Sequence, residues 1–275
     1  MVSTAAIAIR VAQEEAPSLS LAAWRLTLAT LILAPLALGR HRAELTRLSR
    51  VELTRAVAAG LLLALHFATW ISSLEFTSVA ASVVLVATNT LFVSLLSPLL
   101  LKESVPRIML VGVIVAIVGS GMIGLGDLGG GSAPLLGDLL ALAGAICGAG
   151  YMMIGRTLRR KLNLITYIFV VYGVAAVTLL AIALLSRQPM GGFSAQTYGA
   201  FLYLAVGPQL IGHTSFNWAL RYLSAAYVTV TLLSEPIGSS LLAWLLLDEP
   251  PTPLEVGGGM LILAGIAIAS RTERK

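Results

Sequence analysis

Glu235 is the residue of this sequence whose position most directly suggests chemistry. It lies near the middle of an apolar run, residues 225–249, that is about long enough to cross a membrane. A carboxylate at bilayer depth costs roughly 2.5–3.5 kcal/mol on insertion scales, so it normally faces a partner, a cavity or a transport route. Tyr227 and Thr231 precede it by eight and four residues and would share its face on a continuous helix. That face could bind a substrate ammonium or exchange a proton, whereas the alternative is a structural glutamate that pairs with an arginine or bonds backbone freed by Pro236.

Two other polar faces occur at helical spacing. Their members are Gln209, His213 and Asn217 in one segment and His66, Trp70 and Ser73 in another. Both faces could line a polar cavity with aromatic walls for an organic solute, whereas the alternative is interhelical hydrogen bonding, worth about 0.6 kcal/mol per pair. Neither His66 nor His213 belongs to an HxxxH or a carboxylate–histidine spacing, so we expect no metal site and no cofactor.

The apolar run that holds Glu235 repeats an earlier part of the chain. A shift of 146 positions places it on residues 79–103, and 11 of the 30 positions from 74 to 103 are identical in the two copies. Glu235 then falls on Asn89, and Glu249 falls on Glu103. We therefore expect Asn89 to line the same cavity or to bond a neighbouring helix. Glu103 and Glu249 could act as gates or helix caps, or they could be exposed loop carboxylates.

The composition predicts an all-α polytopic membrane protein. Of its 275 residues, 57% are hydrophobic and 11% are charged, against about 25% charged in soluble domains. Ten transmembrane helices are predicted, as two five-helix repeats at 1–126 and 134–271, over residues 1–13, 20–38, 56–74, 78–101, 107–125, 135–155, 164–185, 196–220, 225–247 and 253–270. The first is short, because 13 helical residues span only about 20 Å of a core about 30 Å thick, and about eight more residues upstream would complete it.

The basic residues predict the orientation in the membrane. A cytoplasmic N-terminus puts fifteen Lys and Arg residues in cytoplasmic segments and only Arg187 outside. Both termini are then cytoplasmic, and the two repeats are inverted because five is odd. Inverted repeats are typical of secondary transporters with a site near the bilayer midplane. The net charge of +5 comes from these loops, so nucleic acid is not an expected partner.

Arg10 and Arg25 lie inside the first two segments and could recognise a substrate carboxylate or neutralise Glu235. For Arg25 we favour a side chain that snorkels to the outer surface, since it lies only about a turn and a half inside its segment. Arg10 could instead pair with Glu14, one turn further on.

Several glycines recur between the copies. Gly112 and Gly119 fall on Gly258 and Gly265 after the same shift. Small residues let helices approach closely, and we favour packing within the chain over a dimer face. Whether the protein is a monomer or a homodimer stays open.

These features together resemble the EamA family of the drug/metabolite transporter superfamily. The resemblance is carried by the ending LLxxLLLxE of the fourth helix in each copy (95–103 and 241–249), by Glu235-Pro236, by the glycine-spaced fifth helices and by the opening IRVAQEEAPSLSLAAWRL at 9–26. It covers essentially the whole chain. It implies a ten-helix carrier of the cell inner membrane that exports amino acids or related small metabolites. It also implies a central cavity between the third, fourth, eighth and ninth helices.

The function that we expect is secondary-active export of small amphipathic metabolites by alternating access, not catalysis. The partners would be a small-molecule substrate, the lipid bilayer and protons, with Glu235 and Arg10 as candidate coupling residues. Those four helices contain no Arg or Lys, which disfavours phosphorylated substrates. A drug or amine efflux carrier of the same fold is the alternative, and a membrane-embedded enzyme or scaffold is a more distant one.

Overall fold

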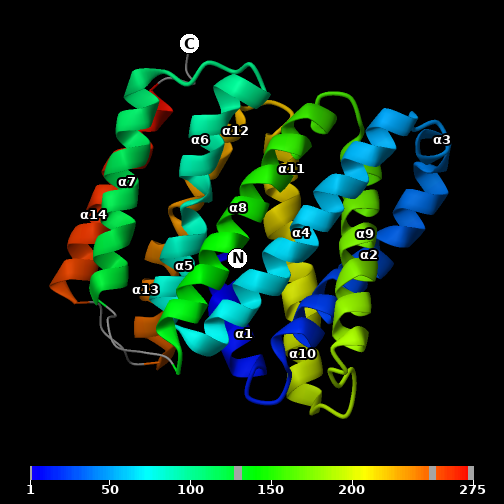
Figure 1. Ribbon diagram of the computed structural model, residues 1–275, viewed down its shortest axis with the longest axis horizontal. Coiled ribbons are helices and arrows are strands. Elements are labelled where there is room, and N and C mark those ends of the chain that lie inside the picture. Colours follow the sequence, from blue (N-terminus) through cyan, green and yellow to red (C-terminus); the bar gives the residue numbers. More distant parts are fainter. Residues whose placement is uncertain (1, 127–131, 248–251, 272–275) are drawn as a thin grey trace.

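The computed structural model describes residues 2–126, 132–247 and 252–271, and every regular element in those ranges is helical. In chain order (Figure 1) the elements are η1 (Val2–Thr4), α1 (Ala5–Ala12), α2 (Ser18–Arg40), α3 (Arg42–Leu45), α4 (Arg50–Phe76), α5 (Val79–Ala87), α6 (Asn89–Leu100), α7 (Arg107–Gly126), α8 (Pro134–Arg159), α9 (Leu164–Leu185), α10 (Ala195–Leu204), η2 (Ala205–His213), α11 (Thr214–Ala219), α12 (Ala225–Leu232), α13 (Glu235–Leu247) and α14 (Pro253–Ser270). η1 is a short 3₁₀ helix, and η2 is a π-helical segment.

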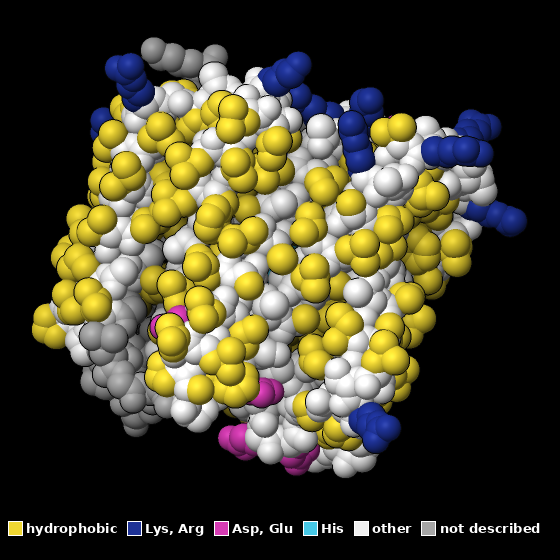
Figure 2. Space-filling view, viewed as in Figure 1, with side chains coloured by type: hydrophobic (Ala, Val, Ile, Leu, Met, Phe, Trp, Pro, Cys, Tyr) yellow, Lys and Arg dark blue, Asp and Glu magenta, His cyan; other side chains and the backbone are white. Residues whose placement is uncertain are grey.

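The helices have the length and composition of a multi-pass membrane protein. Within the described ranges, five helical stretches are long and apolar enough to cross a membrane, namely Ser18–Arg40, Arg50–Phe76, Ala81–Leu100, Pro134–Arg159 and Leu164–Leu185. Shorter apolar helices cover Val2–Ala12, Arg107–Ile123 and Val256–Ser270. Large hydrophobic side chains are exposed over the face seen in Figure 2. An apolar exterior of this kind suits a lipid environment, whereas the same side chains would be costly in water.

The two ends of the helix assembly differ in charge. Figure 2 shows Lys and Arg side chains gathered at one end and acidic side chains at the other. We call the first the basic end. It is formed by the C-terminal ends of α2, α6, α8, α11 and α14 and by the N-terminal ends of α4, α7, α9 and α12.

Two of the predicted segments are interrupted at matching positions. The segment 78–101 breaks at Thr88 between α5 and α6, and the segment 225–247 breaks between α12 and α13. Thr88 N donates to Leu85 O at 3.1 Å, and Ser234 N donates to Thr231 O at 3.3 Å. Both hydroxyls also donate to the same carbonyls, at 2.5 and 2.7 Å. Because these hydrogen bonds close a tight turn, the first helix of each pair stops. The next helix begins at the residue that follows Thr88 or Ser234.

The residues after the two breaks are Asn89 and Glu235, which begin α6 and α13. Pro236 adds a second cause in the later copy, since it lacks the N–H that would continue the hydrogen bonding of α12. Both residues are therefore placed at helix N-termini, where Asn89 is buried and Glu235 is partly buried.

Glycines bring α7 and α14 together along most of their length (Figure 1). A Cβ atom on Gly112 would lie 2.5 Å from Gly265 O, and one on Gly119 would lie 2.5 Å from Gly258 O. The contact is crosswise: Gly112 meets Gly265, the equivalent of Gly119, and Gly119 meets Gly258, the equivalent of Gly112. The expectation that these glycines pack helices within the chain is therefore confirmed.

Glycines also join α8 to α4. A Cβ on Gly144 would lie 3.1 Å from Thr69 Oγ1, and one on Gly148 would lie 3.0 Å from His66 Nδ1. The close approach lets His66 Nδ1 reach Gly144 O at 2.8 Å. This spacing sets the position of the histidine for the site described next.

Candidate functional site

A polar cavity of about 50 Å³ lies inside the helix assembly. Its polar lining residues are Arg25 of α2, His66 and Trp70 of α4, Asn89 of α6, Tyr151 of α8, His213 of η2 and Glu235 of α13. Apolar side chains complete the lining, including Val2 and Ala5 of the short first segment. A cavity of this volume holds a few water molecules. In this conformation, a larger solute would require the helices to separate.

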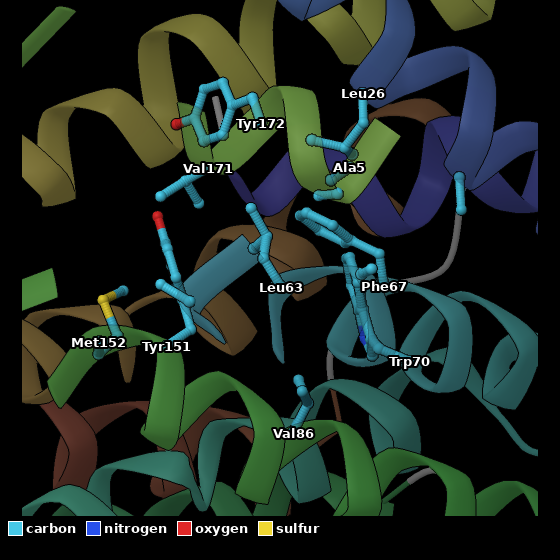
Figure 3. Close-up of a cluster of buried hydrophobic side chains, with 14 of the residues drawn as sticks. Ala5, Leu26, Leu63, Phe67, Trp70, Val86, Tyr151, Met152, Val171 and Tyr172 are labelled. Carbon is cyan, nitrogen blue, oxygen red and sulfur yellow. The ribbon is translucent and has the colours of Figure 1, made fainter. Parts of the chain in front are cut away.

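Aromatic rings form one wall of this cavity. His66 stacks on Trp70 with ring centroids 6.0 Å apart, and the His213 ring lies 5.2 Å from Phe67 and 6.4 Å from His66. Figure 3 shows Phe67 and Trp70 beside one another, with Ala5 and Leu26 next to the Phe67 ring. The rings of Phe67, Trp70 and His66 are buried and that of His213 is partly buried, so the wall is both apolar and able to offer ring nitrogens to a solute.

The direction of the Arg25 side chain is where the structure differs most from the sequence-based expectations. Its side chain is 0% exposed and lines the cavity, so the prediction that it snorkels to the outer surface is wrong. Its Nε donates to Gln209 Oε1 at 2.9 Å, and its guanidinium carbon lies 4.2 Å above the Phe67 ring. These two contacts, a hydrogen bond and a cation–π interaction, hold the side chain inward. The cavity thus has a cation, although the sequence analysis expected its walls to come from four helices that contain no Arg or Lys.

Several buried nitrogen atoms at the cavity have no hydrogen-bond partner among the described residues. They are Nη1 and Nη2 of Arg25, Nε1 of Trp70 and Nδ1 of His213. Among the described residues, no carboxylate oxygen lies within 4 Å of Arg25. Arg25 and Glu235 do interact electrostatically at longer range. Buried polar groups are normally paired, so this group of atoms is suited to a polar ligand or water.

Asn217 and Gln209 lie behind the cavity wall. Asn217 Nδ2 donates to Tyr151 Oη at 2.5 Å and to His213 O at 2.8 Å, and Asn217 is not a lining residue. Gln209 contacts the cavity only through Arg25. Sequence reasoning placed both on one face with His213, whereas in the structure they orient side chains that face the cavity.

Tyr227 and Thr231 do not share a cavity face with Glu235. Tyr227 Oη donates to Ser270 Oγ at 3.2 Å, and Thr231 Oγ1 donates to Val228 O at 2.7 Å. Neither residue lines the cavity. The prediction of one continuous face is wrong because the turn at Leu233 and Ser234 rotates α13 relative to α12.

Arg10 lies away from the cavity. Its Nη1 donates to Leu74 O, and the pairing with Glu14 does not occur. The structure therefore gives Arg10 a helix-tying contact and no direct place in the cavity.

Glu103 is a well-paired carboxylate at the basic end. Its Oε1 accepts from Arg156 Nε at 2.6 Å and from Arg160 Nη2 at 2.8 Å, and its Oε2 accepts from Ala225 N at 3.4 Å. It thus ties the C-terminal end of α8 to the N-terminus of α12, and the alternative of an exposed loop carboxylate is wrong. Its repeat partner Glu249 lies outside the described residues.

Tyr151 is a lining residue that sequence reasoning missed. It is buried on α8, and Figure 3 shows its hydroxyl pointing toward Val171. The spacing of Gly144, Gly148 and Tyr151 puts all three on one helix face, which is the signal that could have found it. In the described part of the chain, no group of three or more His, Cys, Asp or Glu side chains could hold a metal ion.

The fold and the site define a class of protein: a helical membrane protein with a buried polar cavity at the ends of broken helices, an arrangement used by secondary transporters. The profile of the EamA-like transporter family matches residues 1–125 and 135–271. The chain belongs to this family, as the sequence resemblance indicated.

Similar proteins are named for transport. The pseudopaline exporter CntI of Pseudomonas aeruginosa is 28% identical over 82% of this chain and 78% of that protein. A probable terminal-alkyne amino-acid exporter of Streptantibioticus cattleyicolor is 28% identical over 68% of this chain and 62% of that protein. An uncharacterized transporter of Archaeoglobus fulgidus is 28% identical over 68% of this chain, and the match spans 66% of that relative's length.

A protein of known crystal structure has the same fold. It superposes with a TM-score of 0.78 and 19% sequence identity, over 99% of this chain and 96% of the other. The chain is therefore a membrane transporter of the EamA-like family, and the family and relatives are named for transport rather than catalysis.

Proposed function

We propose that this protein is a secondary carrier that exports amino acids or related small amphipathic metabolites by alternating access. The observation that carries the proposal is the placement of Asn89 and Glu235. They begin the second halves of two broken helices, 146 positions apart, and both line one buried cavity. Helix termini at membrane depth are where secondary transporters bind polar solutes. The names of two relatives, an amino-acid exporter and the pseudopaline exporter, support export of small metabolites.

Matching contacts support ten spans arranged as inverted repeats, 1–126 and 134–271. Ser78 and Ser224 cap α5 and α12 by accepting from Ala81 N at 3.1 Å and Tyr227 N at 3.2 Å. The turns at Thr88 and Ser234 use the same hydrogen bonds, and the fifth helices of the copies meet crosswise. Equivalent local structures at equivalent positions are expected if two copies fold alike and face opposite sides of the membrane.

The charge asymmetry supports the orientation. The basic end would face the cytoplasm of the cell inner membrane. The C-terminal end of α14 lies at that end, and α1 runs from the interior toward the opposite end, which supports cytoplasmic termini. The Glu103 pairing at this end would then close the cytoplasmic mouth in the conformation seen here.

The alternatives are a drug or amine efflux carrier and a membrane-embedded enzyme or scaffold. A buried Arg25 at the cavity repels organic cations, which disfavours amines as the main substrates. The described lining residues of the cavity include the possible bases His66, His213 and Glu235 but no serine or cysteine nucleophile.

Counterflow in proteoliposomes tests the proposal. Vesicles are loaded with a mixed amino-acid and amine pool at two pH values, with wild type, Glu235→Gln and, as a matched control, Glu14→Gln, which removes an exposed carboxylate outside the cavity. We expect saturable exchange in wild type that depends on pH, and loss of that pH dependence only in Glu235→Gln. Exchange that is unchanged in Glu235→Gln would make the glutamate structural. Absence of exchange with every solute would contradict the proposed substrate class.

A further inference from the structure

We propose that Arg25 is the residue that binds the carboxylate of the transported solute. This inference rests on the proposed function and specifies how the same cavity recognises its substrate. Arg25 is fully buried and lines the cavity, and neither of its terminal nitrogens has a hydrogen-bond partner in the described part of the chain.

The geometry fixes the guanidinium so that its free side faces the cavity. Arg25 Nε donates a hydrogen bond to Gln209 Oε1 at 2.9 Å, and the Phe67 ring covers one face of the guanidinium, with its centroid 4.2 Å from the guanidinium carbon. The two remaining nitrogens form a rigid fork that matches the two oxygens of a carboxylate. An arginine held in this way loses little side-chain freedom when a ligand binds, so its contacts contribute fully to affinity.

Neighbouring donors complete an anion site. Trp70 and His213 line the same cavity, and Trp70 Nε1 and, in the tautomer that protonates it, His213 Nδ1 are buried donors without a partner among the described residues. The carboxylate of Glu235 lines it too and interacts electrostatically with Arg25 while lying beyond 4 Å of it. A cavity with one separate cation and one separate anion fits a solute that has a carboxylate and an ammonium group. Arg25 would bind the first and Glu235 the second.

The location of Arg25 distinguishes this role from simple helix packing. A structural arginine would use its terminal nitrogens on backbone carbonyls, as Arg156 and Arg159 do with Leu220 O and Leu162 O. Arg25 makes no such contact among the described residues. Its one side-chain hydrogen bond there is from Nε to Gln209, beside the cation–π contact with Phe67. Burying a guanidinium with two free nitrogens is costly unless an anion or water satisfies them.

Matched probes test the inference on the full chain in proteoliposomes. The amino acid that exchanges fastest in a panel of the common L-amino acids is compared with its carboxamide and with the amine that lacks the carboxylate. We expect wild type to exchange the two neutralised probes at least about tenfold less well, given the usual strength of charge-assisted hydrogen bonds. This comparison needs no variant, so a folding defect cannot obscure it.

Variants then assign the preference to Arg25. Arg25→Gln should lower exchange of the amino acid by a similar factor, while exchange of the amine stays the same or rises because the repulsion of the cation is lost, so that the selectivity disappears. Arg25→Lys should retain part of the selectivity, because Lys offers a charge without the fork. Arg221→Gln, at an exposed arginine of the basic end, is the matched control and should change neither rate. Gln209→Leu removes the hydrogen bond that orients Arg25 but keeps its charge, so this variant should lose only part of the selectivity.

Three results would overturn the inference. Equal exchange of the amino acid and its amine by wild type would leave a carrier without a carboxylate anchor. Recovery of amino-acid exchange in Arg25→Gln/Glu235→Gln would mean that Arg25 only balances the charge of Glu235. Exchange of no amino acid and no amine would remove the proposed function and the anchor with it, which separates that failure from the other two.

Discussion

Arg10 and Arg156 make the same contact in the two copies of this chain. Each donates through Nη1 to the main-chain carbonyl of the residue 64 positions later, Leu74 for Arg10 and Leu220 for Arg156. Arg156 lies at the basic end, whereas Arg10 lies near the opposite end, at the close of α1. The same contact therefore joins neighbouring helices at both ends of the molecule, which supports the inverted repeats proposed above.

The Arg156 contact is reinforced by Glu103, and removing that carboxylate should loosen the basic end. We expect Glu103→Gln to lower the free energy of unfolding by about 1–3 kcal/mol, because two arginines lose a charged acceptor that is mostly buried. Thermal unfolding in detergent measures this. The control is Arg160→Gln, whose side chain is 55% exposed and should cost under about 1 kcal/mol. Equal effects of the two variants would contradict the central place of Glu103.

The crosswise glycine contact predicts a steric effect of a single methyl group. Gly112→Ala should destabilise the protein by about 1–3 kcal/mol, because the Cβ would lie 2.5 Å from Gly265 O and α14 would have to move. Gly121→Ala on the same helix is the matched control, since its Cβ would meet nothing within 4 Å. We expect that variant to be neutral or up to about 1 kcal/mol more stable. Similar unfolding midpoints for the two variants would argue against tight packing of α7 on α14.

The break before Glu235 predicts a separation of stability from transport. Pro236→Ala restores an N–H that can bond the preceding turn, so α12 and α13 would tend to join. We expect exchange to slow several-fold while the unfolding midpoint stays the same or rises. Pro98→Ala, at an exposed proline inside α6, is the control for general effects of proline removal. Unimpaired exchange in Pro236→Ala would show that the break is not needed for transport.

Glu15 predicts an acid-dependent loss of stability at the end opposite the basic one. Thr197 Oγ1 donates to Glu15 Oε2 at 2.7 Å, and Ser194 N donates to it at 3.0 Å. These hydrogen bonds, led by that from Thr197, lower the pKa of Glu15 below its ordinary value of 4.5. The contribution to stability is therefore fully present above pH 4.5 and is lost as the pH falls through the lowered pKa.

The measurement compares unfolding midpoints of wild type and Glu15→Gln between pH 7 and pH 3. Wild type should be the more stable protein at neutral pH, and the difference should shrink on acidification. Glu14→Gln, at the neighbouring and likewise exposed carboxylate, should follow wild type at every pH. A difference between wild type and Glu15→Gln that does not change with pH would contradict this account.

The apolar segments could be predicted from the sequence with little error. The expected segment 164–185 coincides with α9 (Leu164–Leu185), and 107–125 differs from α7 by one residue. Hydropathy succeeds here because a segment in lipid must be mostly helical and apolar, whereas loops contain the polar residues. It places the segments but not the breaks inside 78–101 and 225–247. The cavity residues with a strong polar signal, His66, His213 and Glu235, also lie where the pattern placed them.

What could not be predicted depends on helix breaks and on partners far away in the sequence. Placing Thr231 with Glu235 assumed a straight helix, and only the hydroxyl of Ser234 and the ring of Pro236 indicate the turn between them. The inward direction of Arg25 depends on Gln209, 184 positions away. Depth along a helix is visible in a sequence, but the face that turns inward depends on which helix packs beside it.

The pairing of α7 with α14 has a consequence for how the protein is made. Equivalent residues of these helices are 146 positions apart, so at 5–20 residues per second the ribosome needs roughly 7–30 s to synthesise the chain between them. During that time the glycine face of α7 has no helix to meet and is covered by lipid or by an insertion factor. The late arrival of α14 then completes the interface. A substitution such as Gly258→Leu should therefore act during biogenesis and lower the yield of inserted protein before it affects transport by the assembled carrier.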